Sequence, residues 1–443
     1  MAAPVAQTAS LAIEPPPGDE RELHRRRRDL LATGARLPHA SVTRREVRVE
    51  VADGREPQPR ALHQGQGDRG PVPQQLGQQR IEVDLGAIRH NVARFREVAG
   101  TDVCAVVKAN GYGHGAVPVA RAALDAGASW LAVALVEEGL ELRQAGIDAP
   151  ILVLSEPPIA AIPYLLEAEL TPTVYRAPFL ATLDAAGHAR GTPVDIHLKA
   201  DTGMARVGIP EADWSARLHQ AATARGVRVT AVQTHLARAD EPDAPTTSEQ
   251  MEVLDRFLAE AAKLGIRPDL IHASNSAGSL LHDRARRTML RPGIGIYGLS
   301  PGPEVDAAVH GLEPALRLVS EVGFAKYVAE GTPVSYGHHW SAPHAGWIAT
   351  VPVGYADGVP RALSNKVEVL HGGRRCLIVG RVCMDQTLVW CDDAEPHVGD
   401  PVVLLGAQGD DRIRVEEWAA AADTITYEIV TQLTARVPRH HYG

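Results

Sequence analysis

The stretch VCAVVKANGYGHG, residues 103–115, places a short apolar run directly before a lysine, a tyrosine and three glycines. An amine at the end of a buried strand is partly desolvated, which lowers its pKa and suits Lys108 to bonding covalently with a carbonyl group. The glycines let the backbone approach a ligand closely, and Tyr112 offers a hydroxyl to a phosphate. By position alone, a solvated lysine is the commoner alternative. The stretch is therefore a candidate ligand site at a strand end.

This apolar run is the first of eight, which alternate with helix-like intervals such as residues 118–126 and 136–145. The runs cover residues 103–107, 130–134, 151–154, 171–175, 194–198, 229–234, 270–273 and 288–297. Eight strand-helix units predict an α/β fold, a parallel (β/α)8 barrel of the TIM type, with reactive groups just after the strands. A doubly wound open sheet is the alternative, but no GxGxxG follows the first run.

After about Leu312 the pattern changes to successive strand-like runs joined by turns such as Gly372-Gly373. These runs cover residues 316–328, 347–353, 366–370, 376–382 and 401–405. Consecutive strands with glycine turns predict a C-terminal, mostly antiparallel β domain. The expected organisation is a barrel over residues 80–311 and a β domain over residues 312–443.

The first 79 residues contain Pro15 to Pro17, the run Arg25 to Arg28, and a tract over residues 54–79 with few apolar residues and much Gln, Gly, Pro and Arg. Such a segment cannot bury enough surface to order itself, so we expect a disordered extension. A start codon assigned too far upstream is the alternative. Residues 1–80 carry 13 Arg, no Lys and 10 Asp or Glu, a net charge of +3 that leaves −12 for the remainder. The acidic remainder argues against a nucleic-acid partner.

The four cysteines show no paired CxxC spacing, so we expect neither a disulfide framework nor a zinc site, and no metal at all. They are Cys104, Cys376, Cys383 and Cys391, and packing is the expected role of all four. Free thiols fit a reducing compartment, which predicts a cytoplasmic location. No apolar stretch is long enough to cross a bilayer, so no membrane association is expected.

The segment around Lys108 resembles the lysine segment of alanine racemases, which reads VKANxYGHG and carries pyridoxal 5'-phosphate on its lysine. Further segments match that family in its order: KADTGMARVG at 199–208, THLA at 234–237, HASNSA at 272–277, RPGIGIYG at 291–298, VSYG at 334–337, VGYADG at 353–358 and RVCMD at 381–385. The ending, with Tyr427-Glu428 and RVPR at 436–439, also fits. The resemblance spans residues 81–443. It implies a head-to-tail homodimer that interconverts L-alanine and D-alanine and supplies D-alanine for peptidoglycan.

Several residues are candidates for holding the cofactor. A barrel's last loops commonly bind phosphate through backbone N–H groups, which points to Gly293 and Ile294. The resemblance adds the hydroxyls of Tyr112, Ser276 and Tyr427. Considered singly, Ser276 is as readily a helix cap and Tyr427 a packing residue.

The resemblance places Arg291 against the cofactor's ring nitrogen, where a cation disfavours protonation of the ring and can suppress side reactions. An arginine paired with a barrel carboxylate is the structural alternative. Racemisation needs two acid/base groups, one on each face of the substrate's α-carbon. The resemblance assigns them to Lys108 and to Tyr336 of a second subunit, with His235 linking Tyr336 to Arg291. From the residues alone, Tyr336 is an ordinary turn tyrosine and His235 a core histidine.

The resemblance places Arg206 and the Met384 backbone at the substrate carboxylate, supported by Lys199 and Asp385. Lys199 is carbamylated in some members of the family, and a simple pairing with Asp201 is the alternative. Ala205 stands where many relatives have glycine, so a preference for another small amino acid, such as serine, stays open. A pyridoxal-phosphate carrier without catalysis and a decarboxylase on the same barrel are the competing classes. The β domain and Tyr336 count against the carrier, and the SYG and RVCMD pairing counts against the decarboxylase.

Overall fold

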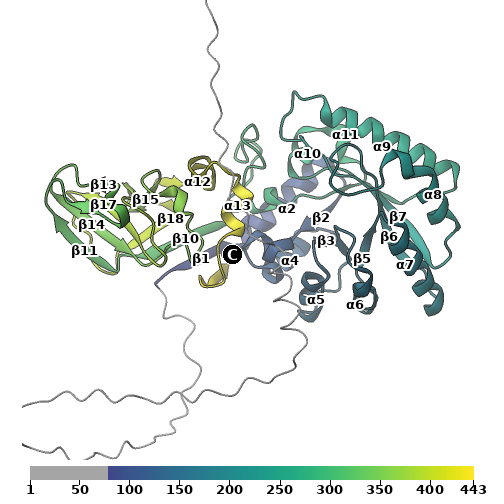
Figure 1. Cartoon of the computed structure of the whole chain (residues 1–443), viewed down its shortest axis with the longest axis horizontal. Coiled ribbons are helices and arrows are strands. Elements are labelled where there is room, and N and C mark those ends of the chain that lie inside the picture. Colours follow the sequence, from purple (N-terminus) through teal and green to yellow (C-terminus); the bar gives the residue numbers. More distant parts are fainter. Residues whose placement is uncertain (1–77) are drawn as a thin grey trace, which may run out of the picture. The chain divides into compact units, whose positions relative to one another are not determined.

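The structure is a computed structural model that describes residues 78–443 (Figure 1). The extension expected over residues 1–79 lies outside the described residues, apart from Gln78 and Gln79. The described part contains an eight-stranded parallel sheet and a set of mainly antiparallel sheets.

The eight parallel strands follow one another in the order of the sequence-based prediction. They are β2 (Asp102–Val106), β3 (Trp130–Val133), β4 (Ile151–Val153), β5 (Thr171–Val174), β6 (Val194–Lys199), β7 (Val227–Gln233), β8 (Leu270–His272) and β9 (Met289–Leu290). The sheet order is β8-β7-β6-β5-β4-β3-β2-β9. Between its two end strands, the N–H of Thr288 donates to Ile271 O and that of Arg291 to Ser274 O, both at 3.1 Å. The predicted (β/α)8 barrel is therefore confirmed.

The eighth apolar run is shorter as a strand than we expected. Only β9 is extended, and the predicted strand over residues 288–297 is wrong beyond Leu290, because η3 (Ile294–Tyr297) is a 3-10 helix. Pro292 lacks an N–H for a strand ladder, which stops the strand at this point. An apolar run alone does not distinguish a buried strand from a buried helical turn.

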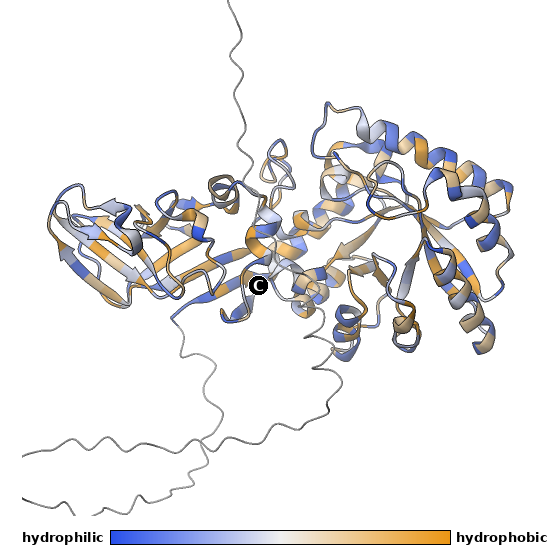
Figure 2. Cartoon of the chain, in the orientation of Figure 1, coloured by the Kyte–Doolittle hydropathy of each residue, from blue (hydrophilic) through white to orange (hydrophobic). Residues whose placement is uncertain are grey.

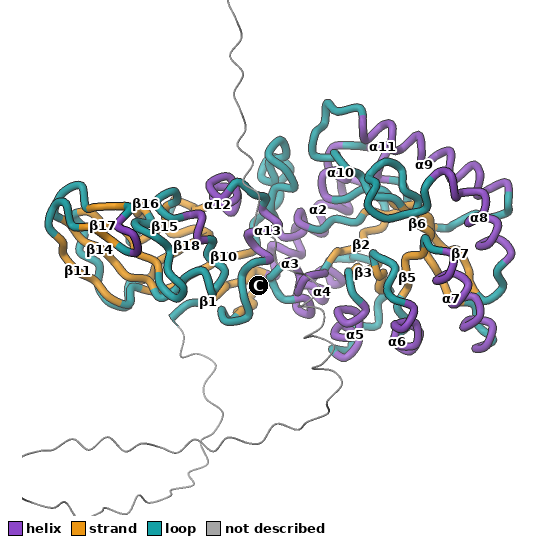
Figure 3. Tube along the Cα trace, viewed as in Figure 1, coloured by secondary structure: helices purple, strands orange, loops and turns teal. Residues whose placement is uncertain are grey.

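Helices separate the barrel strands in sequence (Figure 3). They are α2 (Leu85–Ala99), α3 (Lys108–Tyr112), α4 (Ala116–Asp125), α5 (Val136–Gln144), η1 (Ile159–Ala161), α6 (Ile162–Glu167), α7 (Ala177–Arg190), η2 (Glu211–Asp213), α8 (Trp214–Thr223), α9 (Thr246–Lys263), α10 (Ser276–Leu281) and α11 (Asp283–Arg286). Helix α9 is amphipathic, with alternating apolar and polar residues in Figure 2. Its Met251, Leu254 and Phe257 are buried at helical spacing, so this face packs into the core.

The C-terminal part is built mainly of strands, as predicted. They are β10 (Leu316–Glu321), β11 (Phe324–Val328), β12 (Pro333–Val334), β13 (Trp340–Ser341), β14 (Gly346–Val351), β15 (Glu368–His371), β16 (Arg374–Leu377), β17 (Thr387–Asp392), β18 (Pro401–Gln408), β19 (Asp411–Ile413) and β20 (Arg439–Tyr442). The short helices of this part are η4 (Tyr336–His338), η5 (Arg361–Leu363), α12 (Val415–Ala422) and α13 (Thr426–Thr431).

Strand β1 (Arg80–Asp84) precedes the barrel in sequence but lies in the sheet of the C-terminal part. It pairs antiparallel with β10 and parallel with β20. The order of that sheet is β16-β15-β18-β10-β1-β20, with β19 added on β18. The domain boundary near residue 311 stays a prediction.

The run expected over residues 316–328 is two strands in two different sheets. Strand β10 lies in the seven-stranded sheet, and β11 pairs with β14 in the sheet β11-β14-β17. At the crossing, Val322 N–H donates to Asp400 O and Gly323 N–H donates to Thr350 O. The chain changes partners at Gly323, which continuous hydropathy does not reveal. Within residues 78–443, no helix combines the length and apolar character that crossing a bilayer requires.

Candidate active site

Lys108 lies directly after β2, as the sequence predicts, and begins an unusual turn. The next four residues, Ala109 to Tyr112, all have positive φ, between 51° and 60°. For L-residues this left-handed conformation costs roughly 1–2 kcal/mol each. The turn is held by bonds from Gly111 N–H to Val107 O at 2.8 Å and from Gly113 N–H to Ala109 O at 3.0 Å. Four consecutive residues in this conformation directly after Lys108 concentrate backbone strain there, which is typical of a functional site.

Glu138, in the first turn of α5, secures this turn with its carboxylate. Its Oε1 accepts the Ala109 N–H at 2.6 Å, and its Oε2 accepts the N–H groups of Ala134 and Leu135 at 2.8 and 3.1 Å. One carboxylate thus ties the loop after β2 to the loop after β3. Glu138 was not among the residues predicted from the sequence, although a glutamate three positions after Leu135 has the spacing of a helix capping box.

The end of the chain holds the same turn from the other side. The Nε–H of Arg439 donates to Gly113 O at 3.1 Å, and His441 Nε2 lies 2.7 Å from His114 O. A Cβ on Gly113 would lie 2.2 Å from Val430 O, so only glycine allows this approach. The C-terminal segment therefore packs against the loop that carries Lys108.

Burial and charge both act on the Lys108 amine. Burial lowers its pKa, the nearby Arg206 lowers it further, and Glu138 raises it in part. Its Nζ lies 5.9 Å from the centre of the Tyr112 ring. A lowered pKa increases the fraction of the amine that is neutral and able to accept a proton near neutrality.

Beside Lys108, four of the candidate cofactor residues lie together. The Ser276 hydroxyl oxygen accepts the N–H groups of Gly293 and Gly295, each at 3.0 Å. A Cβ on Gly293 would lie 2.4 Å from the Tyr112 hydroxyl, so a side chain at this position would fill the space between them. The ring of Tyr427 lies 6.1 Å from that of Tyr112. Three hydroxyl-bearing side chains and the backbone amides of Gly293 and Gly295 thus surround one small region.

Tyr297 packs against Tyr112 at this region and was not among the residues predicted from the sequence. Its hydroxyl donates to Val106 O at 3.0 Å, and its ring lies 5.0 Å from the Tyr112 ring. It lies in the RPGIGIYG segment, so the matching string was the available signal.

Arg291 is buried, and the partners of its guanidinium are not carboxylates. It donates to His272 Nδ1 at 2.7 Å and to the carbonyl oxygens of Thr234 and Ala273 at 2.6 and 3.1 Å. His235 Nδ1 lies 3.4 Å from the same guanidinium. Burial lowers the pKa of Arg291 to about 10, so it stays charged at neutral pH. These contacts differ from the alternative of a structural pair with a carboxylate.

Arg291 determines the protonation of the buried histidines behind it. A guanidinium can only donate, so His272 Nδ1 accepts and its Nε2 carries the hydrogen. That Nε2 lies 3.1 Å from His197 Nδ1, which must then accept as well. Burial and the Arg291 charge lower the pKa of His272 well below 6.5 and that of His197 to about 3. The result is a chain of neutral imidazoles, which no pattern in the sequence predicted.

His235 follows β7, where the sequence analysis placed it. Burial and then Arg291 lower its pKa well below 6.5, so its ring is neutral. Because its Nδ1 faces the guanidinium, its Nε2 carries the hydrogen and is available to a second group.

Lys199 ends β6, and burial together with Arg291 and Arg206 lowers its pKa to about 8. The Asp201 carboxylate accepts the N–H groups of Gly203 and Ala205, at 3.0 and 3.1 Å. Asp201 in turn raises the pKa of Lys199 in part, although no ion pair within 4.0 Å joins the two side chains in the described residues, so their pairing stays an alternative.

The candidates from the β domain are exposed. Tyr336 is 72% exposed and Met384 is 54% exposed. Their loops adjoin, because the Ser335 hydroxyl donates to Arg381 O at 2.7 Å and lies 3.6 Å from Cys383 Sγ. The structure brings these two loops together, and within the described residues no hydrogen bond or ion pair joins them to Lys108. Asp385, next to Met384, accepts from Arg436 at 2.8 Å.

The fold and these side chains define a class: a (β/α)8-barrel enzyme with an appended β domain and a lysine site at the carboxyl ends of the strands. Two family models match the chain, the alanine racemase N-terminal domain over residues 83–301 and the alanine racemase C-terminal domain over residues 315–441. The chain belongs to the alanine racemase family.

Individual relatives agree with the family models. The chain is 46% identical over 364 residues to the alanine racemase of Symbiobacterium thermophilum, covering 82% of this chain and 96% of that one. A crystal structure of alanine racemase from the D-cycloserine-producing Streptomyces lavendulae superposes with a TM-score of 0.80 at 40% identity, covering 83% and 97% of the two chains. The crystal structure of the Bacillus anthracis alanine racemase with bound L-Ala-P superposes with a TM-score of 0.77 at 37% identity. The superposition covers 84% of this chain and 96% of that one.

Proposed function

We propose that this chain is a pyridoxal-phosphate-dependent alanine racemase that interconverts L-alanine and D-alanine. It would act in the cytoplasm and supply D-alanine for the synthesis of peptidoglycan. The observation that carries the proposal is the Lys108 amine, with its lowered pKa, beside the region formed by Tyr112, Ser276 and Gly293. Relatives that are over 40% identical to this chain are named alanine racemase, and the alignments cover nearly their whole length.

The residues present fit the cofactor. Gly293 leaves space that any Cβ would fill, and the surrounding hydroxyls and amides are donors suited to a phosphate. Lys108 would bind the cofactor covalently, and Tyr112, Ser276, Tyr427 and the backbone of Gly293 and Ile294 would hold its phosphate. When bound, the cofactor supplies an electron-withdrawing group that makes the substrate's α-proton removable.

Arg291 would face the ring nitrogen of the cofactor. Its pKa of about 10 keeps it charged, and its own partners are neutral imidazoles and carbonyls. A fixed cation at that position disfavours protonation of the ring nitrogen. The arginine thereby favours return of the proton to the α-carbon over side reactions.

Two groups would exchange the α-proton, one from each face. The Lys108 amine accepts or returns it on one face, and the Tyr336 hydroxyl of a second subunit acts on the other. The Nε2–H of His235 would donate to the Tyr336 oxygen and so stabilise its ionised form. Arg206 and the backbone N–H of the partner's Met384 would bind the substrate carboxylate, supported by Lys199 and Asp385.

The test is to incubate the purified enzyme with each L-amino acid and to follow the D-enantiomer by chiral chromatography. We expect D-alanine to form fastest. If L-serine reacts faster, the proposed reaction stays a racemisation but the preferred substrate is serine and not alanine. If no amino acid yields its D-enantiomer, the proposal is refuted.

A further inference from the structure

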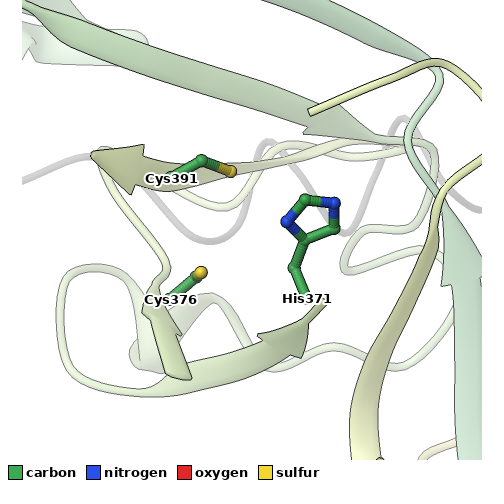
Figure 4. Close-up of side chains that lie close together, drawn as sticks. All are labelled: His371, Cys376 and Cys391. Carbon is green, nitrogen blue, oxygen red and sulfur yellow. The ribbon is translucent and has the colours of Figure 1, made fainter. Parts of the chain in front are cut away.

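The β domain brings a histidine and two cysteines close together (Figure 4). His371 ends β15, Cys376 lies on β16 and Cys391 lies on β17. One potential ligand atom of each residue lies within 4.8 Å of those of the other two. All three are buried, at 8%, 8% and 2% exposure. We refer to these three residues as the His-Cys-Cys cluster.

The strand pairing explains why these residues converge. In the β15–β16 hairpin, Val369 faces Cys376, and His371 is two residues further along the same strand. Residues two apart share a face of the sheet, so His371 and Cys376 are diagonal neighbours on one face. Cys391 is a buried position in the alternating pattern of β17, which belongs to the other sheet. The cluster therefore spans the contact between two sheets.

The imidazole of His371 is held in place by a carboxylate. Its Nε2 lies 3.2 Å from Asp400 Oδ2, and that oxygen also accepts the backbone N–H of His397 at 2.8 Å. The other ring nitrogen is on the side of the two sulfur atoms (Figure 4). A histidine that donates one N–H to a carboxylate and turns its second nitrogen inward has the usual arrangement of a metal ligand.

We propose that the His-Cys-Cys cluster binds a zinc ion that joins the two sheets of the β domain. Two thiolates and one imidazole are ligands that zinc prefers, and a water can complete the tetrahedron. Bond lengths of about 2.3 Å to sulfur and 2.0 Å to nitrogen set ligand atoms roughly 3.5–3.8 Å apart. Separations within 4.8 Å need only a small inward movement to reach this spacing.

This site departs from the expectation that the cysteines serve only in packing and that the chain binds no metal. Its ligands come from three strands and two sheets, so no short CxxC motif marks them in the sequence. It is separate from the racemisation chemistry, since none of its residues belongs to the candidate active site.

The direct test is the zinc content of the untagged, full-length holoenzyme, grown with added zinc, gel-filtered in metal-free buffer and measured by plasma mass spectrometry. We expect about one zinc per chain, and background zinc in the Cys376→Ser, Cys391→Ser double variant. Cys383→Ser is the matched control, because Cys383 lies outside the cluster, and it should keep its zinc. Equal zinc in parent and double variant would overturn the proposal, as would a Cys376–Cys391 disulfide in freshly purified protein without zinc.

A second measurement does not depend on the folding of the cysteine variant. The parent is stripped with a chelator and then titrated with zinc chloride, with the thermal unfolding midpoint as the readout. We expect the midpoint to fall on stripping and to recover with one equivalent of zinc. Asp400→Asn should weaken zinc binding about 10–100-fold, the usual effect of losing the carboxylate partner of a metal-bound histidine. A midpoint that ignores both chelator and zinc would contradict a structural metal.

Discussion

At the scale of single residues, the candidate site depends on how one charge is surrounded. Arg291 is buried among carbonyl oxygens and two imidazoles, and burial together with its charge keeps His235 and His272 neutral. A neutral His235 can present an N–H to a second group, which a tyrosine acting as a base requires. Burial, and then the same charge, lowers the pKa of Lys199.

Replacing the two proposed acid/base groups should have different effects. Tyr336→Phe should keep the visible absorbance of the bound cofactor and lose about 10²–10⁴-fold in racemisation, the usual contribution of one acid/base group. Lys108→Ala should lose the covalently bound cofactor itself. Absorbance spectra and chiral turnover assays measure the two effects. Full racemisation by the Tyr336→Phe variant would exclude a two-base mechanism.

Glu138→Gln should impair catalysis through the turn that carries Lys108. The amide has one acceptor oxygen, so at least one of the three backbone N–H groups loses its partner, a hydrogen bond to a charged group worth about 1.5–3 kcal/mol. Glu138 also raises the pKa of Lys108, so the variant's apparent basic pKa in a pH–rate profile should move down.

The exposed neighbour supplies the control for that experiment. Glu137→Gln makes a similar change of charge one residue away, and none of the bonds to the turn involves Glu137. We expect its pH–rate profile to match the parent. If both variants shift equally, general electrostatics and not the turn explains the effect.

At the scale of elements, the site depends on contacts between strand ends that are far apart in sequence. The loop after β2 is held by Glu138 from helix α5 and by Arg439 from the last strand. The histidine chain joins β6, β8 and the residue after β9. These contacts explain how a strained left-handed turn can persist, since strain survives only where several neighbours define the same conformation.

The histidine chain predicts the direction of pH dependence of stability. The folded-state pKa of His197 is about 3, so below about pH 6.5 the unfolded chain takes up a proton that the folded protein does not. The stability contributed by the neutral His197 is complete above pH 6.5. As the pH falls toward 3, the free energy of unfolding decreases by up to about 1.4 kcal/mol per pH unit.

His197→Gln should therefore flatten the acid limb of the stability curve. Between pH 7 and pH 5 we expect the variant to lose about 2 kcal/mol less free energy of unfolding than the parent. Urea unfolding at the two pH values measures the difference. Identical losses would mean that His197 does not stay neutral in the folded protein.

At the scale of the whole molecule, a single chain does not assemble the proposed site. Tyr336 and Met384 lie on adjoining exposed loops of the β domain, while Lys108 and Arg291 lie in the barrel. Head-to-tail pairing of two chains would place the exposed loops of each at the barrel of the other. A lone subunit should then bind the cofactor without racemising its substrate.

Complementation tests this arrangement. A heterodimer of one Lys108→Ala chain and one Tyr336→Phe chain contains one site with both groups intact. We expect mixing and reassembly of the two inactive variants to restore activity, to about half the parent's value per heterodimer, by the symmetry of two shared sites. If the mixture stays as inactive as its components, each site is contained within one chain.

Removal of the N-terminal extension is a further test at this scale. The described strands begin at Arg80, and both family models begin later, at residues 83 and 315. We expect a chain without residues 1–79 to keep its thermal midpoint and turnover. An insoluble or inactive truncation would show that the extension contributes to the fold.

The sequence by itself determined the barrel, the β domain and the order of the site segments. Strand and helix periodicity is local, and the string around Lys108 is distinctive. It did not determine how residues far apart meet. The left-handed turn, the His272–His197 chain and the break at Gly323 depend on which backbone and side-chain groups neighbouring elements supply.

Only the tertiary structure shows that the residues of the His-Cys-Cys cluster lie together. His371, Cys376 and Cys391 look like ordinary strand residues in sequence, and only the packing of one sheet on another brings their ligand atoms together. Periodicity shows which face a side chain occupies, whereas the neighbour of that face is set by the packing of the whole domain.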